Sequence, residues 1–219
     1  MPGQKPSLQS SAKSTAGPKL TGRFIRALGY SARVHAHQMR KGKDRPYIGH
    51  LLGVASIVIE HGGDEDQAIA ALLHDAVEDQ GGRPRLEEIR RKFGSRVARM
   101  VDGCTDAYSD PKPEWHARKK AYVERIRREP AEIQLISAAD KLHNAREVLA
   151  DFRLVGDAVW SRFKGGKEGT LQYYRQMVDA LSESGRTPLV DELARVVSKL
   201  ERLANPASTD PEPMNSGKN

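Results

Sequence analysis

Apolar residues recur at every third or fourth position through the interior of this 219-residue chain, and no stretch alternates convincingly with a period of two. A period of about 3.6 residues is typical of a helix with one buried face, whereas strict alternation is typical of a half-buried strand. Glycine and proline fall between the periodic segments, as at Gly62-Gly63, Gly94 and Pro130. The sequence therefore predicts an all-α bundle of about eight to ten helices. They are expected near residues 20–38, 50–61, 65–79, 85–93, 95–103, 116–128, 131–151, 157–163, 168–183 and 188–204.

The two ends of the chain differ in composition from its interior. Residues 1–18 and 205–219 are rich in small polar residues and proline, which predicts disordered tails around a single domain over 19–204. The first 18 residues lack the apolar centre of a secretory signal, and no apolar run approaches membrane-spanning length. We therefore expect a cytoplasmic protein with no membrane partner.

The formal net charge of +7 favours an anionic partner but does not separate a small phosphate-bearing ligand from a polymer. A nucleic-acid binder is expected to interleave aromatic and basic residues, and this chain has only four Phe, two Trp and six Tyr. Cys104 is the single cysteine, which excludes an internal disulfide and a cysteine-based zinc site. We therefore expect no nucleic-acid partner, and the sequence leaves open whether the chain forms a homo-oligomer.

The stretch LLHDAVED, residues 72–79, carries one imidazole and three carboxylates in an otherwise apolar run. At about 100° per residue, a continuous helix over 65–79 would have an apolar stripe and one ionisable face. Ala68 and Ala71 lie on the ionisable side, and such small residues indicate that other elements approach it closely. Taken alone, the stretch is equally compatible with the solvated side of an amphipathic helix. The ionisable face consists of His74, Asp75, Glu78 and Asp79.

Two other segments supply residues of the same kind. Asp140 lies among small and apolar neighbours, where a carboxylate needs a partner, either a metal or a basic residue such as Lys141. His50 directly precedes the apolar run 51–59. Together with His74 and Asp75 they offer two imidazoles and two carboxylates. This mixed donor set suits a hydrolytic divalent ion such as Mn²⁺ better than a closed structural zinc site.

The motifs resemble those of the HD superfamily of metal-dependent phosphohydrolases, which is named for the adjacent pair seen here as His74-Asp75. More narrowly, the chain resembles the hydrolase domain of RelA/SpoT proteins and the stand-alone small alarmone hydrolases. The resemblance covers about 20 to 183 in the family's order, with Leu51 standing where the family commonly has proline. It is carried by HAHQMRKGKDRPYIGHLLGVASIV (35–58), AALLHDAVED (70–79), FGSRVARMVDGCTD (93–106) and AADKLHNAREVL (138–149).

The resemblance implies a fold, an activity and roles for individual residues. It implies an HD-domain helical bundle in which His50, His74, Asp75 and Asp140 hold one Mn²⁺. The implied reaction is hydrolysis of guanosine tetra- or pentaphosphate to GDP or GTP, with release of pyrophosphate from the 3′ position. The chain leaves no room for a synthetase domain, so we expect no alarmone synthesis. Glu78 and Asp79 would position or deprotonate the attacking water, Asn144 would lie near the metal's outer shell, and Arg40, Lys41 and Tyr173 would contact the nucleoside.

Residue chemistry is consistent with this reaction. A carboxylate one helical turn from a metal ligand can accept the proton of a water or orient it. Charge on the phosphates calls for converging cations, of which we expect about two among six basic residues to contact substrate. These six are Lys112, Arg118, Lys119, Lys120, Lys164 and Lys167.

Two other functions remain open at this point. One is an HD phosphohydrolase that acts on another nucleotide, such as an adenosine alarmone or a deoxynucleotide. The other is a non-catalytic module that binds alarmone. Degeneration to such a module should have removed a ligand or an acid, and all six proposed residues are present.

Overall fold

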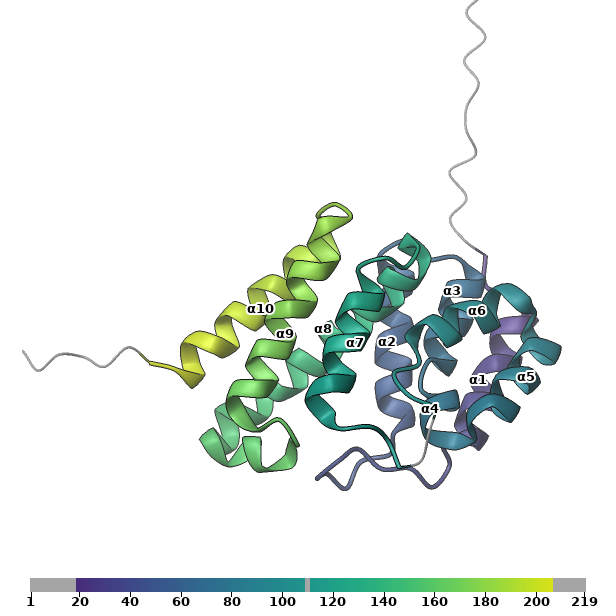
Figure 1. The fold of residues 1–219 in the computed structure, drawn as a ribbon. Coiled ribbons are helices and arrows are strands. Elements are labelled where there is room, and N and C mark those ends of the chain that lie inside the picture. Colours follow the sequence, from purple (N-terminus) through teal and green to yellow (C-terminus); the bar gives the residue numbers. More distant parts are fainter. Residues whose placement is uncertain (1–18, 109–110, 207–219) are drawn as a thin grey trace, which may run out of the picture.

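The computed structural model describes residues 19–108 and 111–206. Within these ranges the chain forms ten α-helices, one 3₁₀-helix and no strand beyond an isolated β-bridge, so the predicted all-α bundle is confirmed (Figure 1). The tail predicted at 1–18 and most of the one predicted at 205–219 lie outside the described residues. The helices are α1 (Gly22–Val34), α2 (Ile48–Glu60), α3 (Glu65–Leu73), α4 (Ala76–Gln80), α5 (Gly82–Phe93), α6 (Ser95–Cys104), α7 (Trp115–Ile126), α8 (Ala131–Val155), η1 (Gly156–Arg162), α9 (Gly166–Glu183) and α10 (Pro188–Ala204).

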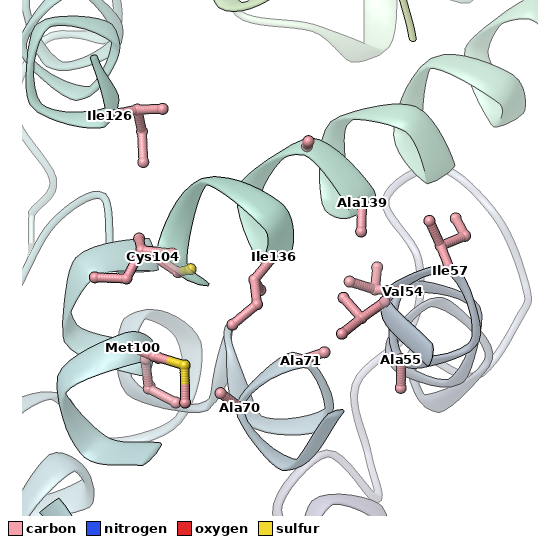
Figure 2. Close-up of a cluster of buried hydrophobic side chains, with 14 of the residues drawn as sticks. Val54, Ala55, Ile57, Ala70, Ala71, Met100, Cys104, Ile126, Ile136 and Ala139 are labelled. Carbon is pink, nitrogen blue, oxygen red and sulfur yellow. The ribbon is translucent and has the colours of Figure 1, made fainter. Parts of the chain in front are cut away.

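The core is built around α8, the longest helix of the described ranges. Figure 2 shows apolar side chains from α2, α3, α6, α7 and α8 meeting in one cluster that includes Val54, Met100 and Ile136. Ala68 and Ala71 are fully buried, which confirms the close approach expected from their size. Small residues on α3 let α2 and α6 approach its backbone, and this packing fixes the end of α3 against the middle of α8.

The helix expected over 65–79 is interrupted, and that expectation is wrong at its C-terminal half. The α3 helix ends at Leu73, His74 and Asp75 form a turn, and α4 starts at Ala76. Two backbone carbonyl oxygens that would accept helical hydrogen bonds in a continuous helix accept hydrogen bonds from side chains instead. The His74 Nδ1 lies 2.8 Å from the Ala71 oxygen, and the Ser31 hydroxyl donates to the Leu72 oxygen at 2.7 Å. Such side-chain bonds compete with the helical ladder and redirect the chain there.

The first helix also ends earlier than the expected range 20–38, at Val34. The segment 35–47 then folds back on itself, since Met39 pairs with Pro46 and the Tyr47 amide donates to the Gln38 oxygen at 2.9 Å. This segment leads directly into α2, which begins two residues before His50. Among the described residues, no helix is both long and apolar enough to cross a membrane.

A second, smaller apolar cluster joins the C-terminal half of α8 to η1, α9 and α10. It includes Val148, Val159, Trp160, Leu171 and Leu200. Helices α7 and α9 lie side by side (Figure 1).

Candidate active site

Four residues from α2, from the turn between α3 and α4, and from α8 meet in one place. His50 lies in the first turn of α2, His74 and Asp75 form the turn between α3 and α4, and Asp140 lies in the middle of α8. The His50 Nε2 is 3.2 Å from Asp140 Oδ1 and 3.6 Å from Asp75 Oδ2. The His74 Nε2 is 2.9 Å from Asp75 Oδ2 and 3.7 Å from Asp140 Oδ1. The structure thus brings together all four predicted ligands, here called the His–Asp cluster.

The donor geometry of this cluster fits a cation. Within the described residues, one ligand atom from each of His50, His74 and Asp140 lies within 4.8 Å of the others. The Nε2 atoms of both imidazoles are buried and have no hydrogen-bond partner in the described part of the chain. The His74 Nδ1–H donates to the Ala71 carbonyl, so the Nε2 lone pair faces two carboxylates. A positive charge is needed between them, and a divalent ion would supply it.

The electrostatics of the cluster lead to the same conclusion. Burial alone lowers the pKa of His74, but the charges of Asp75 and Asp140 outweigh burial and raise this pKa well above its usual value. Burial raises the pKa of Asp140, but the Lys141 ammonium and the two imidazoles outweigh it, so this pKa falls well below its usual range. Both carboxylates are therefore ionised at neutral pH, and the place that attracts a proton also attracts a metal ion.

The orientation of His50 depends on His143, which sequence reasoning missed. The two Nδ1 atoms are 3.0 Å apart, so one ring donates to the other. Burial and the neighbouring His50 lower the pKa of His143 to about 4, so His143 is neutral and can accept. When His143 accepts, His50 donates from Nδ1 and turns its Nε2 lone pair into the cluster, which is how an outer partner orients a metal-binding histidine. His143 could have been found from its spacing, because it follows Asp140 by three residues on the same helix and such residues lie next to each other on the helix surface.

Gly53 leaves the space that the His143 ring occupies. A Cβ at Gly53 would lie 2.3 Å from His143 Cδ2 and Nε2, so the ring would have to move. We expect Gly53→Ala to lower Mn²⁺ affinity about 10- to 100-fold, the effect typical of losing an outer partner of a ligand. Isothermal titration with Mn²⁺ measures it. Gly49→Ala, on the same helix with no atom within 4 Å of its Cβ, is the control and should bind Mn²⁺ normally. Equal affinities of the two variants would contradict this role of His143.

Tyr47 and Asn144 hold the two carboxylates of the cluster. The Tyr47 hydroxyl donates to Asp75 Oδ2 at 2.6 Å, and burial raises the pKa of this tyrosine, so it remains a donor. The Asn144 amide nitrogen donates to Asp140 Oδ1, and its oxygen accepts from Arg40 Nη2 at 2.7 Å. Asn144 therefore contacts the proposed ligand Asp140, and Arg40 fixes the orientation of its amide.

Glu78 and Asp79 lie on α4, one turn beyond His74 and Asp75, and each contacts Lys112. The Lys112 Nζ is 2.7 Å from Glu78 Oε1 and 3.3 Å from Asp79 Oδ1. The Gln38 amide donates to Asp79 Oδ2 at 2.9 Å. The Asp106 backbone amide donates to Glu78 Oε2 at 3.0 Å. Both acids are therefore fixed in place beside a cation.

Asp106 organises further cations and was also missed by sequence reasoning. Its carboxylate is almost completely buried and pairs with Arg118 and with Lys119, the latter at 2.7 Å. Arg118 also approaches Glu78 Oε1 at 3.8 Å. Three of the six predicted phosphate ligands, Lys112, Arg118 and Lys119, therefore gather around the acids.

Beside the cluster lies a pocket of about 380 Å³, here called the main pocket. Its lining includes predicted residues Arg40, Lys41, Asp79, Lys119, Asn144 and Tyr173. It also includes Lys141, which is paired with Asp140 and lies over the Tyr122 and Tyr173 rings at 5.1 and 6.0 Å. Lys167 is not among the lining residues and pairs with Asp157 at 3.3 Å, while Lys120 and Lys164 are exposed outside this pocket.

Comparison with known proteins defines the class. A family model described as an HD domain matches residues 27–171, so the chain belongs to the HD-domain family, as its motifs suggested.

Individual relatives of known name are more specific. The chain is 38% identical over 128 residues to the Homo sapiens protein named guanosine-3′,5′-bis(diphosphate) 3′-pyrophosphohydrolase MESH1, covering 57% of this chain and 69% of that one. The Drosophila melanogaster protein of the same name is 35% identical over 129 residues, which are 58% of this chain and 69% of that one. A solved structure of a metazoan ortholog of SpoT, described as hydrolysing ppGpp, matches with a TM-score of 0.69 and 25% identity over 84% of this chain and 98% of that one. A Listeria monocytogenes EGD-e structure matches with a TM-score of 0.62 and 33% identity over 69% and 97% of the two chains.

Proposed function

We propose that this protein hydrolyses guanosine tetra- and pentaphosphate to GDP and GTP, and that it releases pyrophosphate from the 3′ position. The observation that carries the proposal is the His–Asp cluster: two buried, unpartnered Nε2 atoms (among the described residues) converge on two carboxylates beside a cation-lined pocket. The names of the relatives supply the substrate and the bond. A small nucleotide is the proposed partner, and a cytoplasmic location remains a prediction from the sequence.

We assign the four residues of the His–Asp cluster, His50, His74, Asp75 and Asp140, as ligands of one divalent ion. Two nitrogen and two oxygen donors, with further coordination positions open, suit Mn²⁺ in a hydrolytic site. When bound, such an ion supplies Lewis-acid polarisation of a phosphoryl oxygen and a water of lowered pKa. His143, Tyr47 and Asn144 orient the ligands.

Glu78 and Asp79 are assigned to the attacking water. Hydrolysis adds this water to the phosphorus next to the 3′ oxygen and breaks that phosphorus–oxygen bond, so a proton must leave the water and another must reach the 3′ oxygen. A carboxylate fixed near the cluster can accept the first proton. Gln38 and the Asp106 amide hold the two acids in place, one each.

Lys112, Arg118 and Lys119 are assigned to the 3′ pyrophosphate. Negative charge is spread over its phosphoryl oxygens during the reaction, and fixed cations stabilise that charge. In the free protein these cations are paired with Glu78, Asp79 and Asp106, so they are held in place before substrate arrives. Arg40, Lys41 and Tyr173 line the main pocket and are assigned to the nucleoside.

The test is direct. Purified protein with Mn²⁺ and guanosine tetraphosphate is expected to release pyrophosphate and GDP in equal amounts, measured by chromatography. The corresponding adenosine compound serves as the comparison for base preference. Absence of pyrophosphate release, together with intact Mn²⁺ binding, would reject the proposed substrate while leaving the metal site in place.

A further inference from the structure

A second groove adjoins the main pocket and has no role in the reaction as proposed so far. It lies between α7 and α9, has a volume of about 380 Å³, and is here called the α7–α9 groove. Trp115, Lys119 and Tyr173 line both the groove and the main pocket. The two spaces therefore meet at these three residues.

The α7–α9 groove is cationic. Lys119, Lys120, His116 and Arg127 line it, and Glu124 is its single acidic lining residue. Glu124 lies 3.8 Å from Arg127, which also pairs with Glu183, so the two glutamates balance that arginine. Neither His116 nor Lys120 has an ion pair within the part of the chain that the structure describes. The groove therefore has positive charge that no described acid balances.

The boundary between the two spaces also carries an unsatisfied donor. The Tyr173 hydroxyl is buried and has no hydrogen-bond partner in residues 19–108 and 111–206. The Tyr173 side chain is over nine-tenths buried, and Lys119 lies 4.9 Å from its ring centroid. A buried hydroxyl without a partner is costly, so an acceptor from a ligand is expected to meet it. An anionic oxygen fits, because Lys119 and Tyr173 both donate.

The opposite side of the main pocket offers less to an anion. There two acids of α8 lie among the cations: Glu147 pairs with Arg40 and Lys43, and Asp151 pairs with Lys43 and Arg162, whereas Lys41 has no ion pair among the described residues. A phosphate chain placed on that side would meet two carboxylates. At the rim shared with the groove, Lys119 pairs with one acid, Asp106, and Lys120 beyond it has no ion pair among the described residues.

We infer that the α7–α9 groove binds the 5′ phosphate chain of the nucleotide, with Lys120 as its cationic ligand and His116 as a hydrogen-bond donor. The inference rests on the proposed function, in which the substrate carries phosphates at both ends of the ribose. The 3′ pyrophosphate lies at the His–Asp cluster, and the 5′ chain passes Lys119 and Tyr173 into the groove. Lys120 and His116 then determine how well the enzyme distinguishes substrates by their 5′ phosphates.

The experiment compares three guanosine 3′-pyrophosphates that differ at the 5′ position, which carries a hydroxyl, a diphosphate or a triphosphate. We expect Lys120→Glu to raise KM about tenfold for the 5′-diphosphate and 5′-triphosphate, the size of one lost charge-assisted contact, with kcat within about twofold. KM for the 5′-hydroxyl compound should stay within about twofold. Lys199→Glu, on α10 away from both spaces, is the matched charge control and should behave as the unmodified protein.

The outcomes separate this inference from the proposed function. A Lys120→Glu variant that loses activity equally on all three substrates, or on none, overturns the groove assignment. An equal loss in Lys199→Glu would show a general effect of net charge and also overturn it. If the unmodified protein releases no pyrophosphate from any of the three, the proposed function itself fails. His116→Gln should add to the Lys120→Glu effect only on substrates with 5′ phosphates.

Discussion

His74→Ala is expected to abolish pyrophosphate release and saturable Mn²⁺ binding while the helical bundle stays folded. The imidazole donates its Nδ1–H to the Ala71 carbonyl and directs Nε2 at Asp75 and Asp140. Its removal deletes one of four proposed ligands and leaves two buried carboxylates near each other. Loss of the ion removes several kcal/mol of transition-state stabilisation, so the rate should fall at least about 10³-fold.

The measurement combines turnover, Mn²⁺ titration and circular dichroism on the same preparation. His61→Ala is the matched control, because His61 ends α2 away from the cluster and its Nδ1 contacts only the Ile57 carbonyl. That variant should bind Mn²⁺ and turn over normally. Full turnover by a folded His74→Ala protein would reject the assignment of the His–Asp cluster as the metal centre.

The helical fold was predictable because each helix carries its own apolar stripe, and such stripes are local properties of the sequence. The break between α3 and α4 was not predictable in that way. It depends on the Ser31 hydroxyl, which reaches the Leu72 carbonyl from 41 residues away, and on the His74 ring bonding to its own helix. Neither bond alters the period of the apolar residues, so this period alone predicts one continuous helix over 65–79. The break places His74 and Asp75 in a turn, where both side chains reach the cluster.

The proposed metal ligands could be picked out from the sequence because His50, His74, Asp75 and Asp140 are unusual residue types within apolar surroundings. Residues that act through these ligands left a weaker signal. Gly53 looks like any small helical residue until His143 is placed against it. Asp106 lies in the segment between α6 and α7, which has no periodic pattern of apolar residues. Only the packing of α7 brings Arg118 and Lys119 to it. Lys167, predicted from charge alone, pairs with Asp157 outside the main pocket.

The two acids of α4 can be separated by substitution. Glu78→Gln is expected to lower kcat about 10²- to 10⁴-fold, the usual contribution of a general base, without loss of Mn²⁺ binding. Glutamine keeps an oxygen that can accept from the Asp106 amide, so the local structure should persist, but it cannot take up a proton. Asp79→Asn is the paired variant, because Asp79 shares Lys112 with Glu78 and is held by Gln38 instead. Turnover at several pH values and Mn²⁺ titration measure both.

The pH profile distinguishes the acid that accepts the proton from the acid that only positions the water. Removal of the base should abolish the decrease of kcat toward low pH. Removal of a positioning acid should lower kcat at every pH and leave that decrease in place. Glu87→Gln, on the exposed face of α5, is the control and should leave the whole profile unchanged. If Glu78→Gln and Asp79→Asn both keep kcat within about threefold, neither acid handles the water, and the proton must pass to a different group in the main pocket.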